Sequence, residues 1–132
     1  MTLAELEGDV VILACAISAG IHGALAPRHF AEGFGAGVGF VAATAALAGL
    51  VVWLTLWATS PLALDAAAAV LLGLLASYAL AVTSGLPFLH PEAEPVDGLA
   101  LATKAVEVVG LVVAASLLLR PLIALNPQPK GT

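Results

Sequence analysis

The chain has 132 residues, of which 61% are hydrophobic and only 10% are charged. A soluble domain carries about 25% charged residues, so this composition leaves too little polar surface to face water and predicts a protein whose solvent is lipid. The 4 basic and 9 acidic residues give a net charge of −5. This balance excludes the clustered Lys and Arg residues on which nucleic-acid binding depends.

Four apolar segments of nearly membrane-spanning length follow one another along the chain. A hydrocarbon core of about 30 Å needs about 20 helical residues at a rise of about 1.5 Å each. The sequence predicts helices over residues 10–26, 37–57, 61–83 and 97–120. We therefore expect an all-α fold, an integral membrane four-helix bundle with up-down-up-down topology. It would form one domain over residues 1–125, followed by a loose polar tail at 126–132.

Proline and capping residues indicate where these helices begin and end. Pro27 is expected to end or kink the first helix. Ser60 is a good N-cap for the third helix and Pro61 suits its first position, while Asp97 is a good N-cap for the fourth. The basic residues are nearly balanced between the two sides of the membrane. We discount Lys104 because it lies inside a predicted helix, and place both termini in the cytoplasm and the protein in the plasma membrane.

All three histidines fall on one side of the membrane in this topology. His22 lies in the last turns of the first helix, His29 in the first loop and His90 in the third loop, and Glu32 and Glu92 lie in the same two loops. Imidazole and carboxylate suit zinc, iron, manganese or Cu(II). The pattern predicts one divalent transition-metal ion or metal cofactor, bound through His22, His29 and Glu32, with His90 or Glu92 completing the set of five candidate ligands. The alternatives are a packed histidine in the bundle and ordinary solvated loop residues.

Three polar residues lie deeper in the predicted bilayer, namely Ser18, Lys104 and Glu107. Ionisable groups at such depth are costly and usually face a bundle interior or a wet cavity. We expect an outward-facing polar pocket between the first and fourth helices, with Tyr78, Thr83 and Ser84 added from the third. The alternative is that Lys104 extends to the interface or pairs with Glu107 on its own helix.

The segments around these residues resemble a known group of proteins. Gly20-Ile21-His22 through Pro27-Arg28-His29-Phe30-Ala31-Glu32, with Gly85-Leu86-Pro87 and Pro91-Glu92-Ala93-Glu94-Pro95, resembles small, uncharacterised four-helix membrane proteins of actinobacteria and related bacteria. The resemblance covers most of the chain and implies four helices, but no activity. In that group the position of Arg28 is often acidic and that of His90 often glycine, which makes His90 dispensable.

Three functions from different classes are compatible with this sequence. The leading one is a non-enzymatic multi-pass membrane protein with the outward-facing pocket described above. The second is a non-catalytic accessory subunit of a larger membrane complex. The third is a small transporter that works as a homo-oligomer, with Glu107 as a proton- or ion-coupled carboxylate.

Overall fold

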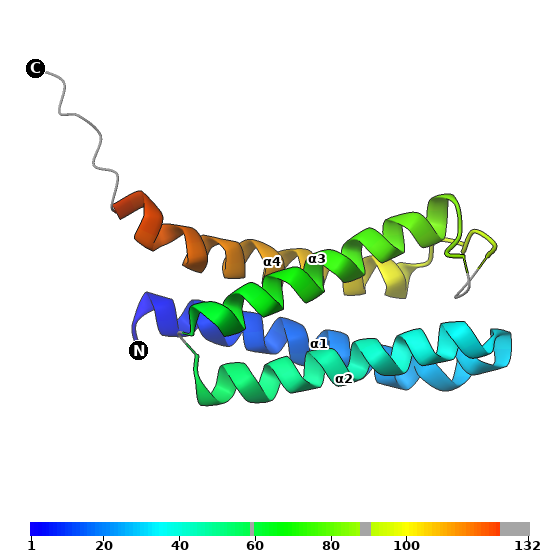
Figure 1. The fold of residues 1–132 in the computed structure, drawn as a ribbon, viewed down its shortest axis with the longest axis horizontal. Helices are drawn as coiled ribbons and strands as arrows, with labels where there is room; N and C mark the ends of the chain where they lie inside the picture. The colour runs from blue at the N-terminus through cyan, green and yellow to red at the C-terminus, as the bar shows by residue number, and fades with distance from the viewer. Residues whose placement is uncertain (59, 88–90, 125–132) are drawn as a thin grey trace, which may run out of the picture.

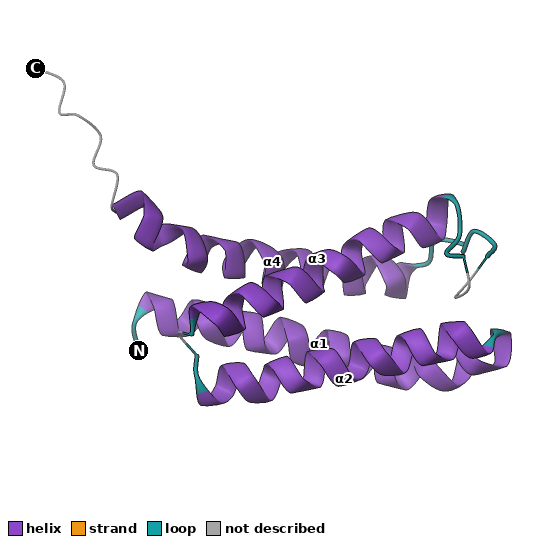
Figure 2. Ribbon diagram, in the orientation of Figure 1, coloured by secondary structure: helices purple, strands orange, loops and turns teal. Residues whose placement is uncertain are grey.

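The computed structural model describes residues 1–58, 60–87 and 91–124, with side chains as far as residue 121. The described residues form four α-helices (Figures 1 and 2). They are α1 (Leu3–Glu32), α2 (Phe34–Leu56), α3 (Pro61–Thr83) and α4 (Gly98–Ala124). The prediction of an all-helical fold with four helices is confirmed. All four helices are long and apolar enough to cross a membrane.

The first helix is much longer than the predicted segment 10–26. It begins at Leu3 because Thr2 and Glu5 form a capping box, in which each side chain bonds to the backbone of the other. It passes through Pro27 and ends only at Glu32, so the placement of His29 and Glu32 in a loop is wrong. Proline deprives the helix of one hydrogen bond, and packing of the flanking turns against α2 offsets that loss.

The connection between α1 and α2 is the single residue Gly33 instead of a ten-residue loop. Its tightness depends on Phe30, whose ring lies directly against the α-carbon of Gly37. A β-carbon at position 37 would collide with this ring, so glycine is needed for the close approach of the two helices. The second helix accordingly begins at Phe34, three residues before the predicted start at residue 37.

The starts of α3 and α4 agree with their predicted caps. The Ser60 hydroxyl accepts a hydrogen bond from the amide of Ala63, and Pro61 occupies the first turn. The Asp97 carboxylate accepts a hydrogen bond of 2.7 Å from the amide of Ala100. The fourth helix continues past the predicted end at residue 120, through Pro121.

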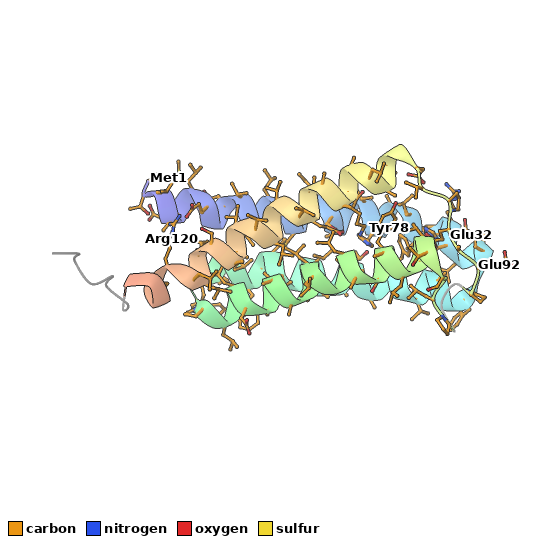
Figure 3. All side chains as sticks on the ribbon, turned by 90° about the horizontal axis from the view of Figure 1, so that it is seen from above. Met1, Glu32, Tyr78, Glu92 and Arg120 are labelled. Carbon is orange, nitrogen blue, oxygen red and sulfur yellow. The ribbon has the colours of Figure 1, made fainter. Side chains whose placement is uncertain are left out.

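The four helices pack unevenly. Helix α1 packs most extensively on α2 and then on α4, whereas α2 and α3 share a smaller interface. Figure 1 shows α3 diverging from α2 towards the end of the bundle where α1 stops and α2 starts. We call this end the pocket end. At the opposite end, labelled by Met1 and Arg120 in Figure 3, Arg120 forms an ion pair with Glu7.

The outside of the bundle is apolar, unlike that of a soluble protein. Large apolar residues cover it, while the interior holds leucine and valine together with alanine, serine and glutamate. The exposed group includes Leu13, Ile17, Val41, Val52, Leu72, Val108 and Val112, and the buried group includes Ala14, Ser18, Ala67, Glu107 and Ala114. An apolar exterior of this extent fits a lipid environment. Helix contacts in lipid rely on small residues that let backbones approach closely.

We predict that Gly110 is essential to the contact between α1 and α4, whereas Gly73 is not. A β-carbon at Gly110 would lie 2.7 Å from the Ala14 β-carbon and 3.1 Å from a Leu71 methyl group, but one at Gly73 would meet nothing within 4 Å. Gly110→Leu should therefore lower the stability by roughly 1–3 kcal/mol through overpacking. Gly73→Leu is the matched control and should be neutral or stabilising by up to about 1 kcal/mol through helix propensity. Thermal unfolding in detergent, followed by circular dichroism, measures both; equal melting temperatures would contradict this packing.

Candidate functional site

A carboxylate lies completely buried between α1 and α4. Glu107 is 0% exposed and lies nine residues into α4, which is about 14 Å along the helix axis. Its Oε1 accepts a hydrogen bond of 2.7 Å from the Ser18 hydroxyl of α1. Its Oε2 accepts one of 2.6 Å from the Lys104 ammonium, one turn earlier on α4. Each carboxylate oxygen thus has a donor, as a buried charge requires.

His22 extends this network by one turn of α1. Its Nδ1 lies 2.9 Å from the backbone oxygen of Ser18 and 3.3 Å from the Ser18 hydroxyl oxygen. A carbonyl oxygen only accepts hydrogen bonds, so Nδ1 carries the proton and donates it. The neutral ring then has its lone pair on Nε2, and His22 lines a cavity above the network.

The cavity has a volume of about 650 Å³ and lies at the pocket end of the bundle. All four helices contribute walls, together with Leu86, Glu94, Pro95 and Asp97 of the segment between α3 and α4. The lining is mostly apolar, with charged or polar groups at the floor and the rim. A volume in the range of roughly 300–1,000 Å³ with a few convergent polar groups is typical of small-molecule sites.

The rim is built from the last two turns of α1. The Arg28 guanidinium lies 3.2 Å from Glu32, and Nδ1 of His29 lies 2.9 Å from the other Glu32 oxygen. The His29 ring stacks on Phe40 of α2 with 3.7 Å between ring centroids, and His22 lies 5.2 Å from the same ring. Phe40 therefore contacts both imidazoles and fixes their positions from the neighbouring helix.

Tyr78 of α3 lies next to Lys104 at the floor of the cavity. The Lys104 ammonium lies 5.4 Å from the centre of its ring, within the range of a cation–π contact. The Tyr78 hydroxyl oxygen is buried and has no hydrogen-bond partner among the described residues. Tyr78 lines the cavity, and its hydroxyl is a donor for which the described residues supply no acceptor.

The structure brings most of the predicted site residues to one end of the molecule, but in two groups. Ser18, His22, Lys104 and Glu107 form the connected floor, whereas His29 and Glu32 lie at the rim. Glu92 is exposed and does not line the cavity (Figure 3). His90 lies outside the described residues.

No group of three or more His, Cys, Asp or Glu side chains in the described parts of the chain is arranged to hold a metal ion. The five-residue metal site includes His90, about which the structure says nothing, so metal binding stays a prediction. In the expected third-helix wall, Tyr78 lines the cavity. Thr83 and Ser84 instead bond to carbonyl oxygens of their own helix.

The contribution of α2 could not be anticipated from sequence. Ala36, Gly39 and Phe40 line the cavity, yet α2 has no charged residue to mark it as part of a site. The only available signal was its run of glycines near the first turns, which permits close approach but indicates no ligand. Arg28, Glu94 and Asp97 also line the cavity without having been assigned to it.

Comparisons of this chain with protein-family models, with curated proteins and with solved structures each gave no match.

We predict that replacing Lys104 lowers the stability of the protein more than replacing its ion-pair partner Glu107. Lys104→Met leaves the completely buried Glu107 without its counter-charge and should destabilise by about 3–5 kcal/mol. Glu107→Leu should cost less, because the Lys104 side chain is 14% exposed and its ammonium can turn towards the cavity. The double variant Lys104→Met/Glu107→Leu should recover most of the loss. Thermal unfolding of all three variants in detergent tests the order, and a double variant as unstable as Lys104→Met alone would contradict it.

Proposed function

We propose that this protein is a non-enzymatic multi-pass protein of the plasma membrane that binds a small ligand in the cavity at its pocket end. The helices cross the membrane in up-down-up-down order, both termini are cytoplasmic, and the cavity opens on the outer side. The observation that carries the proposal is the network of His22, Ser18, Glu107 and Lys104 beneath a cavity of about 650 Å³.

A buried ion pair is weak evidence for a purely stabilising role. Desolvation of the two charges offsets most of their attraction, and apolar residues of similar volume often stabilise a protein better. Here the pair lies under a cavity, and Lys104 and His22 line that cavity directly. Retaining charge at this position is therefore better explained by ligand binding than by stability.

Binding from one side is favoured over passage through the bundle. Beyond Glu107, towards the end of the bundle where α1 begins, the interior is a cluster of apolar residues. It includes Val11, Leu47, Leu54 and Leu71, all completely buried. Transport coupled to Glu107 would require this cluster to open, whereas ligand binding requires no such rearrangement.

A metal ion or metal cofactor is the second candidate for the ligand, and one observation favours it. The Nδ1–H group of His22 is bonded to a backbone carbonyl, and Nδ1 of His29 lies beside a carboxylate. Metal-binding histidines are usually held in this way, with the other ring nitrogen directed at the metal. Metal binding of this kind should weaken as the pH falls through the ordinary histidine range, about 6.5, because protons then compete with the metal for the imidazoles.

The proposed topology predicts the location of reporter fusions. Fusions placed after Pro61 and at the C-terminus should be cytoplasmic, and insertions at Gly33 and after Glu94 should be external. Alkaline phosphatase and fluorescent-protein reporters, which are active on opposite sides of the membrane, measure this. An external C-terminal reporter combined with a cytoplasmic N-terminal one would exclude the four-helix crossing.

Ligand occupancy should depend on His22. Wild-type protein purified in mild detergent should carry a small molecule or metal detectable by native mass spectrometry and elemental analysis. His22→Phe preserves a ring but removes both nitrogens, and should lower occupancy by about tenfold through loss of one good hydrogen bond or metal ligand. Asp9→Asn, an exposed carboxylate change far from the cavity, is the control. The proposal would be contradicted by wild-type protein that carries neither a metal nor an organic ligand and that no added metal or small molecule stabilises. The accessory-subunit function would then replace it.

A further inference from the structure

The lining of the cavity extends below the ends of the helices. Gly39 of α2 and Ser77 of α3 both line it, and Ser77 is exposed. Gly39 lies five residues after the start of α2 and Ser77 six residues before the end of α3, which places both about 8–9 Å below the helix ends. Figure 1 shows the two helices diverging here. In the proposed topology, an opening between these two residues would lie at the depth of lipid chains.

A lateral opening at this depth selects a ligand that is dissolved in the bilayer. The Ser77 hydroxyl donates to the Gly73 carbonyl oxygen of its own helix, so the edge of the opening presents no unpaired polar group to lipid. Leu25 and Leu74 add apolar side chains to the lining. An apolar tail can occupy this path while a polar head reaches the floor.

The floor specifies the chemistry of that head. Lys104 donates one of its three N–H groups to Glu107 and lines the cavity, and the buried Tyr78 hydroxyl has no acceptor among the described residues. Both are donors, so they suit acceptor oxygens of a ligand. His22 adds an acceptor, the Nε2 lone pair, for a ligand hydroxyl.

The charges and the aromatic side chains around the cavity narrow the class of ligand further. Glu107 neutralises Lys104, and the other ionisable groups that line the cavity are the carboxylates of Glu32, Glu94 and Asp97, the guanidinium of Arg28 and the imidazoles of His22 and His29. This balance disfavours an anionic head such as a fatty-acid carboxylate. The aromatic rings of Phe40 from α2 and Tyr78 from α3 also line the cavity, and aromatic surfaces suit contact with a flat ring.

We propose that the cavity binds the head of a lipid-soluble quinone, which enters from the membrane between α2 and α3. The quinone carbonyl oxygens accept hydrogen bonds from Lys104 and Tyr78, and in the quinol form one hydroxyl donates to Nε2 of His22. This inference rests on the proposed ligand-binding function and adds the class of ligand and its route.

The test uses the full-length protein in phosphatidylcholine nanodiscs and a tritiated benzoquinone with a ten-carbon tail. Wild type should bind it saturably and melt at a higher temperature in its presence. Tyr78→Phe, which removes only the unpartnered hydroxyl, should weaken binding about three- to tenfold. Ser77→Trp should block the lateral opening and slow association by at least tenfold. Ala69→Trp, a change at another exposed residue of α3 that does not line the cavity, should bind like wild type.

Several outcomes would overturn the quinone assignment. One is that wild-type protein, shown to be folded by cooperative melting, does not bind the quinone saturably. Another is that Tyr78→Phe and Ser77→Trp both bind it like wild type. The third is that an equimolar amount of decanoate displaces the quinone. Decanoate displacement would identify the head as a carboxylate. A different small molecule or a metal recovered from wild type, with no quinone binding, would remove this inference while leaving the proposed ligand-binding function intact.

Discussion

The buried carboxylate of Glu107 is the constraint on which the arrangement of the helices depends. Its two oxygens bond to donors on two different helices, so α1 and α4 cannot slide relative to each other without leaving a charge unpaired in a medium of low dielectric constant. One turn further along α4, Gly110 lies against Ala14 of α1. The polar contact thus fixes the register at the point where the small residues allow the closest approach.

The same constraint divides the bundle into two dissimilar ends. From Glu107 towards the pocket end α3 diverges from α2 (Figure 1), and the bundle holds a cavity with a polar floor and a charged rim. Towards the other end the interior is filled by apolar side chains and finishes at the Glu7–Arg120 ion pair. A ligand site open at one end follows from this asymmetry, because only one end combines space with hydrogen-bonding groups.

Histidines and aromatic rings act together at the pocket end. Phe40 contacts His29 and His22, which are two turns apart on α1, and so links the rim to the floor from a different helix. The Nδ1 atom of each imidazole also has a partner, which is a backbone carbonyl oxygen for His22 and a carboxylate oxygen for His29. Side chains held from two directions lose less conformational freedom when a ligand binds, which favours affinity.

The sequence by itself determined the number of helices and predicted a lipid solvent, since four long apolar segments with few charges can satisfy their backbone in lipid only as helices. It also determined helix starts at Ser60 and Asp97, and the shared face of Ser18 and His22, because capping and helical periodicity are local properties. Only the tertiary structure decided that α1 continues through Pro27, because packing on α2 outweighs the lost hydrogen bond. It alone placed Phe40 and Tyr78 beside the polar floor, because contacts between distant segments depend on how four nearly uniform apolar surfaces pack.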